Sequence, residues 1–111
     1  MKKILIVLLV LVLCGCGKET KKDVYQIMKE NEHIIIDVRT KEEYEQSHVV
    51  GAINIPYDEI NKDINLDKNK IIFVYCKSGN RSNIAYANLT HLGYTVYDLG
   101  AFSNVKLEKT Y

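Results

Sequence analysis

The residues with the clearest chemical potential form the segment YCKSGNRS, residues 75–82. It follows the apolar run KIIFV and precedes NIAYANLTHLGY, so a strand is expected to lead through a short polar loop into a helix. The start of a helix offers unpaired backbone N–H groups and about half a positive charge, which stabilise a thiolate. Catalytic cysteines at such positions have pKa values lowered from about 8.5 to roughly 3.5–7.5. Cys76 is therefore a candidate nucleophile.

The residues after Cys76 have the composition expected of an anion-binding loop. Gly79 lets the backbone bend so that N–H groups point inward, and the basic side chains of the loop add fixed positive charge. A serine hydroxyl can donate a hydrogen bond to the sulfur or to a bound anion. The predicted loop consists of Lys77, Ser78, Gly79, Asn80, Arg81 and Ser82. The alternative is that Cys76 is an inert residue at the end of a core strand, but the polar residues after it argue against this.

The chain of 111 residues has room for one domain, and its composition, 47% hydrophobic and 26% charged, is that of a globular protein. Two continuous apolar runs, HIIIDV and KIIFVY, are typical of strands buried on both faces. Thr40 and Glu43 have the spacing of a capping box, so a helix is expected to begin at Thr40. A first short helix is expected around Val24–Met28, and the remaining segments read as a short strand (GAINIP), a turn or short helix (YDEINKDI), a helix (SNIAYANLTHLG) and a last strand (YTVYDL).

This alternation predicts a small α/β domain with a mostly parallel central sheet flanked by helices. Gly93 stands where a left-handed helix cap is expected, and the polar C-terminal KLEKTY is predicted to be no more than a tail. Parallel sheets bind ligands outside the carboxyl ends of their strands. The segments DVR, residues 37–39, and CKSGNR, residues 76–81, both follow such ends. Asp37 and Arg39 are therefore expected near Cys76.

The first residues resemble a secretory signal. MKK is a basic start, the next ten residues are apolar, and CGCG is a zone of small residues. A membrane-spanning helix needs about twenty apolar residues, so an uncleaved anchor is the less favoured alternative. The segment LCGC resembles the lipobox of bacterial lipoproteins, which implies cleavage before Cys16 and a lipid on its sulfur. The expected organisation is a signal peptide at 1–15, a lipidated cysteine and tether at 16–22, and a folded domain at 23–111.

This organisation has consequences for location, thiols and charge. The domain is expected outside the cytoplasm, anchored by lipid to a bacterial membrane, since two acyl chains hold a protein there stably. Cys14 leaves with the signal and Cys16 carries the lipid, so Cys76 remains as the one thiol and no internal disulfide can form. Without Lys2 and Lys3, 13 basic side chains face 14 acidic ones, which gives no basic patch for nucleic acid. No metal site is predicted around the histidines.

Three segments, DVR, H..GA.NIP and C..G.R, together resemble the single-domain rhodaneses, from about Asp23 to the end of the chain. The resemblance implies a rhodanese-like fold and sulfurtransferase activity without a metal or organic cofactor. Cys76 would accept sulfane sulfur from thiosulfate or a persulfide and pass it, from a Cys76 persulfide, to cyanide or a thiol. The family counterparts of Asp37 and Arg39 brace the active loop. The counterpart of His48 belongs to a structural segment.

The length of the cysteine loop distinguishes a sulfurtransferase from the cysteine phosphatases and arsenate reductases. Four residues lie between Cys76 and Arg81, whereas cysteine phosphatases and the related arsenate reductases have five, so an oxyanion reductase or phosphatase is disfavoured. The other alternative is a non-catalytic rhodanese module that binds a partner or senses sulfur or oxidants. The intact cysteine, glycine and arginine argue for catalysis. Gly100-Ala101 and Val105 replace a frequent Gly-Gly and Trp of the family, which leaves the substrate preference open, and no protein partner is indicated.

Overall fold

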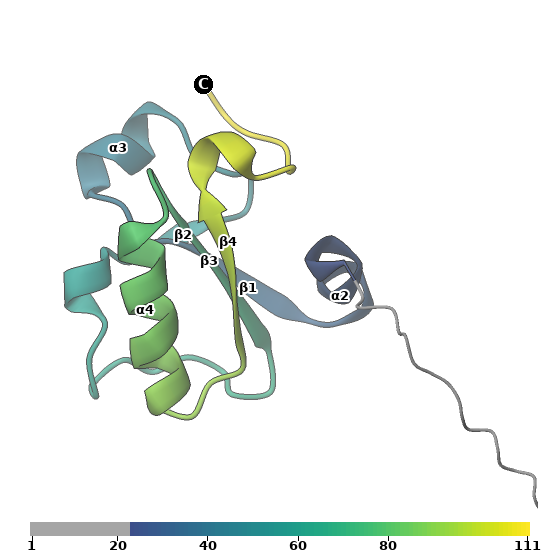
Figure 1. Ribbon diagram of the computed structural model, residues 1–111, viewed down its shortest axis with the longest axis vertical. Coiled ribbons are helices and arrows are strands. Elements are labelled where there is room, and N and C mark those ends of the chain that lie inside the picture. The colour runs from purple at the N-terminus through teal and green to yellow at the C-terminus, as the bar shows by residue number, and fades with distance from the viewer. Residues whose placement is uncertain (1–22) are drawn as a thin grey trace, which may run out of the picture.

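The computed structural model describes residues 23–111, as one α/β domain (Figure 1). The predicted signal peptide, the lipidation site at Cys16 and the tether lie outside the described residues. Within residues 23–111, no helix has the length and apolar character needed to cross a membrane.

A four-stranded parallel sheet with the order β2-β1-β3-β4 forms the centre of the domain. Its strands are β1 (His33–Asp37), β2 (Ile53–Asn54), β3 (Ile71–Cys76) and β4 (Val96–Ala101). β1 pairs with β3 along its whole length, from His33 opposite Ile71 to Asp37 opposite Tyr75. The carboxyl ends of the two interior strands therefore lie level with each other, and Cys76 extends one residue further. The predicted α/β class and parallel sheet are confirmed.

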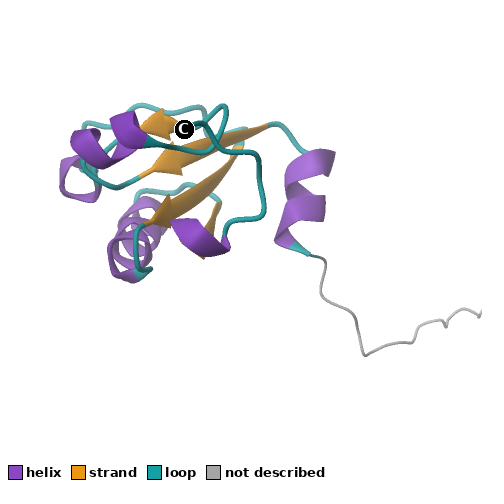
Figure 2. Cartoon of the chain, turned by 90° about the horizontal axis from the view of Figure 1, so that it is seen from above, coloured by secondary structure: helices purple, strands orange, loops and turns teal. Residues whose placement is uncertain are grey.

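The side chains of β3 alternate between the two faces of the sheet, as the pleat requires. One face receives Ile72, Val74 and Cys76, and the other receives Phe73 and Tyr75. All five are completely buried. Because both faces are covered, the strand reads as an unbroken apolar run in the sequence. Figure 2 shows helices on both sides of the twisted strands.

The helix α4 (Asn80–His91) covers the face that contains Cys76 and packs against it through Ala85 and Leu89, both fully buried. Gly79 precedes the helix with φ +102°, and Gly93 follows it with φ +99°. Only glycine adopts such angles without strain. The predicted left-handed cap at Gly93 is confirmed, and α4 begins directly after the cysteine loop.

The opposite face is covered by α2 (Val24–Glu30), with Met28 buried, and by Val49 and Val105. A third helix, α3 (Lys41–Gln46), follows β1 at the carboxyl end of the sheet, where Figure 1 also shows the turn η4 (Phe102–Asn104). A further turn, η3 (Tyr57–Glu59), follows β2.

The capping box of α3 is complete, as the sequence predicts. Thr40 Oγ1 accepts a hydrogen bond of 3.2 Å from the backbone N–H of Glu43, and Glu43 Oε1 accepts one of 2.9 Å from the N–H of Thr40. Two backbone donors of the first helical turn are thereby satisfied.

The prediction that the C-terminus is only a tail is wrong. Residues 105–111, here called the C-terminal strap, run beside the segment 47–50. Val49 and Lys109 form an antiparallel bridge, with hydrogen bonds of 2.8 Å from Val50 N–H to Glu108 O and from Thr110 N–H to His48 O. The polar side chains suggested a free tail, but the strap is held by its backbone and by buried Val105, which side-chain polarity does not report.

Candidate functional site

Cys76 is the last residue of β3 and is completely buried on the face covered by α4. Its position follows from the sequence, because the apolar run of β3 ends there and the chain turns directly into α4. The thiol is therefore both part of the core and the first residue of a polar loop. As predicted, it lies at the N-terminal end of a helix, where the helix dipole favours a negative charge.

Two groups of the loop contact the sulfur. The backbone N–H of Gly79 donates a hydrogen bond of 2.8 Å to Cys76 Sγ. The Cys76 thiol donates a hydrogen bond of 3.4 Å to Oγ of Ser82, which is also completely buried and donates its own proton to Gly79 O at 3.1 Å. The Gly79 contact favours the thiolate, since a hydrogen bond donated to a charged form stabilises that form.

Arg81 is joined to α3 by an ion pair. Its Nη1 lies 2.9 Å from Glu43 Oε1 and its Nη2 lies 3.2 Å from Glu43 Oε2. The pKa of Glu43 is lowered from 4.5 to about 2, mainly by the hydrogen bond from Arg81. Burial opposes this shift, and the hydrogen bond from the Thr40 N–H adds to it. The pKa of Arg81 is raised, first by the hydrogen bond to Glu43 and also by the charge of Cys76. Arg81 thus ends the loop as one half of a pair rather than as a free cation.

Asp37 and Arg39 form a second, buried ion pair at the carboxyl end of β1. Arg39 Nη2 lies 2.7 Å from Asp37 Oδ2, and Arg39 Nε lies 3.0 Å from both carboxylate oxygens. Burial by itself lowers the pKa of Arg39, but the hydrogen bond and the charge of Asp37 outweigh it, so the pKa is raised. The guanidinium also donates to Ser47 O and lies over Phe102, 4.3 Å from the ring centre.

Tyr75, the residue before Cys76, links the Asp37–Arg39 pair to the strand that leads into the cysteine loop. Arg39 Cζ is 5.6 Å from the centre of the Tyr75 ring, on the sheet face opposite Cys76. Burial raises the pKa of Tyr75, and its hydroxyl accepts a hydrogen bond of 3.0 Å from Val49 N–H. The pair therefore supports the strand that carries Cys76 and the adjoining segment, and its side chains do not contact the sulfur.

A cavity of about 290 Å³ lies between these two ion pairs, lined by Arg39, Glu43, Gln46, Lys77, Phe102 and Ser103. These residues come from the end of β1, from α3, from the cysteine loop and from η4. The cavity is large enough for a small anion or a short organic chain. Phe102 supplies an apolar wall and Lys77 a positive charge.

The comparison with known protein families identifies the domain. The family model described as rhodanese-like domain matches residues 20–107. The chain belongs to the rhodanese-like domain family. The resemblance stated from the sequence is thereby confirmed. The match ends before the last four residues, which form part of the C-terminal strap.

Curated relatives of this rhodanese-like domain include two named enzymes. Thiosulfate sulfurtransferase PspE of Escherichia coli strain K12 is 42% identical over 78 residues, which cover 67% of this chain and 75% of that protein. Thiosulfate sulfurtransferase 16, chloroplastic, of Arabidopsis thaliana is 36% identical over 78 residues, covering 57% of this chain and 63% of that protein. Together with the family match, these relatives make the chain a rhodanese-type sulfurtransferase.

Solved structures show the same fold. A rhodanese with anions from E. coli superposes with a TM-score of 0.64 at 38% identity, covering 70% of this chain and 96% of that one. A rhodanese-related protein from Thermoplasma volcanium superposes with a TM-score of 0.65 at 28% identity, covering 79% and 91%.

The remaining predicted loop residues lie at the surface of the rhodanese-like domain. Lys77, Ser78 and Asn80 are exposed, and Asn80 is the first residue of α4. Of the two serines predicted as donors, the structure brings Ser82 to the sulfur, whereas Ser78 faces solvent. His48 stacks on Tyr44 with ring centres 3.8 Å apart, and its Nδ1 lies 2.8 Å from Tyr44 O.

Sequence reasoning missed the part that Glu43 and Phe102 play at this site. Glu43 was assigned only to the capping box, and the same carboxylate also binds Arg81 across 38 residues of sequence. Phe102 was not singled out, although it lies over Arg39 and lines the cavity. The position of Glu43 in the first helical turn after DVR was the only sequence feature that could have indicated its place near the site. No local pattern pointed to Phe102.

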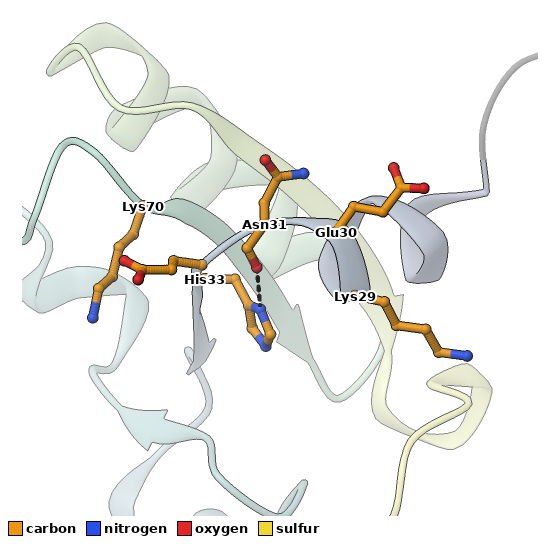
Figure 3. A pocket seen from close by; sticks show the side chains of 6 residues that line it. Lys29, Glu30, Asn31, His33 and Lys70 are labelled. Carbon is orange, nitrogen blue, oxygen red and sulfur yellow. Dashed lines mark hydrogen bonds between the residues drawn. The ribbon is translucent and has the colours of Figure 1, made fainter.

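A larger depression, of about 560 Å³, lies at the opposite end of the sheet (Figure 3). It is open and lined mainly by charged side chains that precede β1 and β3, with His33 Nδ1 3.0 Å from Asn31 O. None of its lining residues belongs to the cysteine loop, whereas Lys77 of that loop lines the smaller cavity, which is therefore the better candidate site. Among residues 23–111, no group of three His, Cys, Asp or Glu side chains is placed to hold a metal ion.

Proposed function

We propose that Cys76 carries sulfane sulfur between two small molecules. In the first half-reaction, the Cys76 thiolate attacks the outer sulfur of thiosulfate or of a persulfide donor. A new bond forms between Sγ and that sulfur, and the S–S bond of the donor breaks. Sulfite, or the thiolate of the donor, leaves with the electron pair, and a Cys76 persulfide remains.

The second half-reaction returns the enzyme to its starting state. A thiophilic acceptor, cyanide or a thiolate, attacks the outer sulfur of the Cys76 persulfide. The bond between that sulfur and Sγ breaks, and Cys76 leaves as a thiolate. The products are thiocyanate or a new persulfide. One cysteine is sufficient, and neither step needs an added oxidant or reductant.

The observation that supports this proposal most strongly is the hydrogen bond from Gly79 N–H to Cys76 Sγ. Together with the start of α4, this hydrogen bond favours a thiolate that serves as nucleophile in one step and as leaving group in the other. Of the predicted loop residues, Gly79 and Ser82 contact Sγ, and Lys77, Ser78, Asn80 and Arg81 complete the loop that would receive the outer sulfur. Because Cys76 is fully buried, the proposal requires the loop to move for a donor to reach the sulfur.

The test uses the full chain in detergent with Cys14→Ala and Cys16→Ala, here called the Cys76-only protein. After incubation with thiosulfate or glutathione persulfide, its intact mass should increase by one sulfur atom. Cyanide should then release one equivalent of thiocyanate and restore the mass. The further substitution Cys76→Ser should abolish both signals. A protein that gains no sulfur from any donor would instead be a non-catalytic module that binds a partner or senses sulfur or oxidants.

The N-terminal features support a second part of the proposal. We propose that residues 1–15 are removed as a signal peptide and that Cys16 carries the lipid that holds the domain at the outer side of a bacterial membrane. In cells, Cys16→Ala should lose membrane association and accumulate as an uncleaved precursor. A Cys16→Ala protein of mature size that still sediments with membranes would contradict this assignment.

A further inference from the structure

The ion pair between Arg81 and Glu43 uses the polar atoms that would otherwise meet an anion. Both terminal nitrogens of Arg81 are engaged, at 2.9 and 3.2 Å from the carboxylate. Glu43 Oε1 also accepts the Thr40 N–H at 2.9 Å, which fixes the carboxylate in the first turn of α3. The guanidinium that ends the cysteine loop is therefore held by a rigid counter-charge.

The charges around Cys76 are thus largely balanced. Arg81 is neutralised by Glu43, and Arg39 is neutralised by Asp37. Lys77 is the cation in the cavity lining that takes part in neither pair. A loop built to attract anions at full strength would leave its arginine unpaired. Here, an anionic donor that uses Arg81 must compete with Glu43 for it.

We propose that Glu43 is a positioning residue that holds Arg81 in this ion pair and thereby lowers the preference of the Cys76 loop for anionic over neutral sulfur donors. The claim about sulfur donors rests on the proposed function, whereas the claim that Glu43 alters the preference of the Cys76 thiol for anionic reagents does not. The pair lies where it can act on the thiol, since Arg81 ends the cysteine loop and directly precedes Ser82, whose Oγ is 3.4 Å from Cys76 Sγ. Its two side chains are each about a quarter exposed, at 25% and 26%, so the effect is screened by salt.

The experiment measures how fast Cys76 reacts with iodoacetate and with iodoacetamide in the Cys76-only protein. The two reagents are almost the same size but differ by one negative charge. Changes in thiol pKa or in access to the buried sulfur alter both rates, so they cancel in the ratio. The substitution Glu43→Gln removes the charge, while glutamine can still complete the capping box with Thr40. We expect the iodoacetate-to-iodoacetamide ratio to rise at least threefold at low salt.

Three further variants separate the proposed route from simpler effects. Glu42→Gln removes the same charge from the exposed neighbouring position of α3 and should change the ratio less than 1.5-fold. Glu43→Asp keeps the charge, so its ratio should be close to that of the Cys76-only protein with Glu43 in place. In an Arg81→Gln background, Glu43→Gln should no longer raise the ratio. The rise should also shrink as sodium chloride is increased.

Any of three results would overturn the inference: an unchanged ratio in Glu43→Gln, an equal rise in Glu42→Gln, or a rise that persists without Arg81. Circular dichroism shows whether each variant is folded, and Glu43→Asp provides a second reading if Glu43→Gln is not. With sulfur donors, Glu43→Gln should lower the KM for thiosulfate more than the KM for an uncharged alkyl persulfide. A protein that transfers no sulfur but shows the expected alkylation ratios would refute the proposed function and leave the role of Glu43 intact.

Discussion

The backbone N–H of Gly79 donates a hydrogen bond of 2.8 Å to Sγ of Cys76, and the same residue has φ +102°. The conformation that only glycine adopts easily is therefore the one that directs this N–H to the sulfur. Loop geometry and thiolate stabilisation depend on a single backbone position.

Gly79→Ala should both destabilise the domain and slow the reaction of Cys76 with iodoacetamide, because the thiolate loses a hydrogen-bond donor. A Cβ at this position would meet no atom within 4 Å, so the cost is backbone strain, about 1–2 kcal/mol. Relaxation of the strain turns the N–H away from the sulfur. Urea unfolding reports the first effect, and the rate of iodoacetamide alkylation at pH 7 reports the second.

Gly51→Ala is the matched control, because Gly51 has φ +87° and also leaves open space around a Cβ. It lies outside the cysteine loop. It should lower stability by a similar amount and leave the alkylation rate of Cys76 unchanged. Equal changes in the alkylation rate of both variants would show that the Gly79 hydrogen bond does not govern the reactivity of the thiol.

Asp37→Asn should be strongly destabilising. It leaves the buried guanidinium of Arg39 without its counter-charge, and an unpaired buried charge costs about 3–5 kcal/mol. The double variant Asp37→Asn with Arg39→Met removes both charges, so it should cost less than the sum of the two single substitutions. Urea unfolding midpoints test this, with the exposed Asp58→Asn as a control expected within about 0.5 kcal/mol of the parent. Additive costs would argue against a coupled pair.

The Glu43–Arg81 pair should contribute to stability in a defined pH range. The pKa of Glu43 is lowered from 4.5 to about 2 in the folded protein. The unfolded state therefore binds the proton more readily, and the contribution is fully present above about pH 5 and is lost as the pH falls toward 2. The difference in urea midpoint between the parent and Glu43→Gln should shrink as the pH falls from 7 to 3. A difference that is constant over this range would show that the ion pair adds nothing.

Removal of residues 108–111 should destabilise the domain, although these residues lie beyond the family match. The truncation breaks the hydrogen bonds to Val50 and His48 and exposes Val49, which is now 1% exposed. At about 1 kcal/mol for each hydrogen bond, we expect a loss of about 2–3 kcal/mol. Hydrogen exchange should also become faster at the Val50 amide. Removal of Tyr111 alone, which is 96% exposed, should have little effect, and an equal loss in both truncations would contradict this role of the strap.

Much of the fold could be predicted from local patterns. The apolar runs marked β1 and β3, the capping box marked the start of α3, and Gly93 marked the end of α4. The spacing of Cys76 and Arg81 indicated the loop and its family. These features depend on neighbouring residues, because helix caps, pleated strands and tight loops are each formed by a few consecutive positions.

By itself, the sequence determined the order of the elements, the place of the nucleophile between a strand and a helix, and the class of enzyme. Only the tertiary structure decided that Arg81 is paired with Glu43, that Asp37 and Arg39 act from the opposite face of the sheet, and that the polar C-terminus is held against residues 47–50. Arg81 and Glu43 lie in segments that follow β3 and β1, which the parallel pairing of these strands brings together, and the C-terminus meets residues 47–50 through an antiparallel bridge. Side-chain polarity and periodicity along the chain carry no record of such partners.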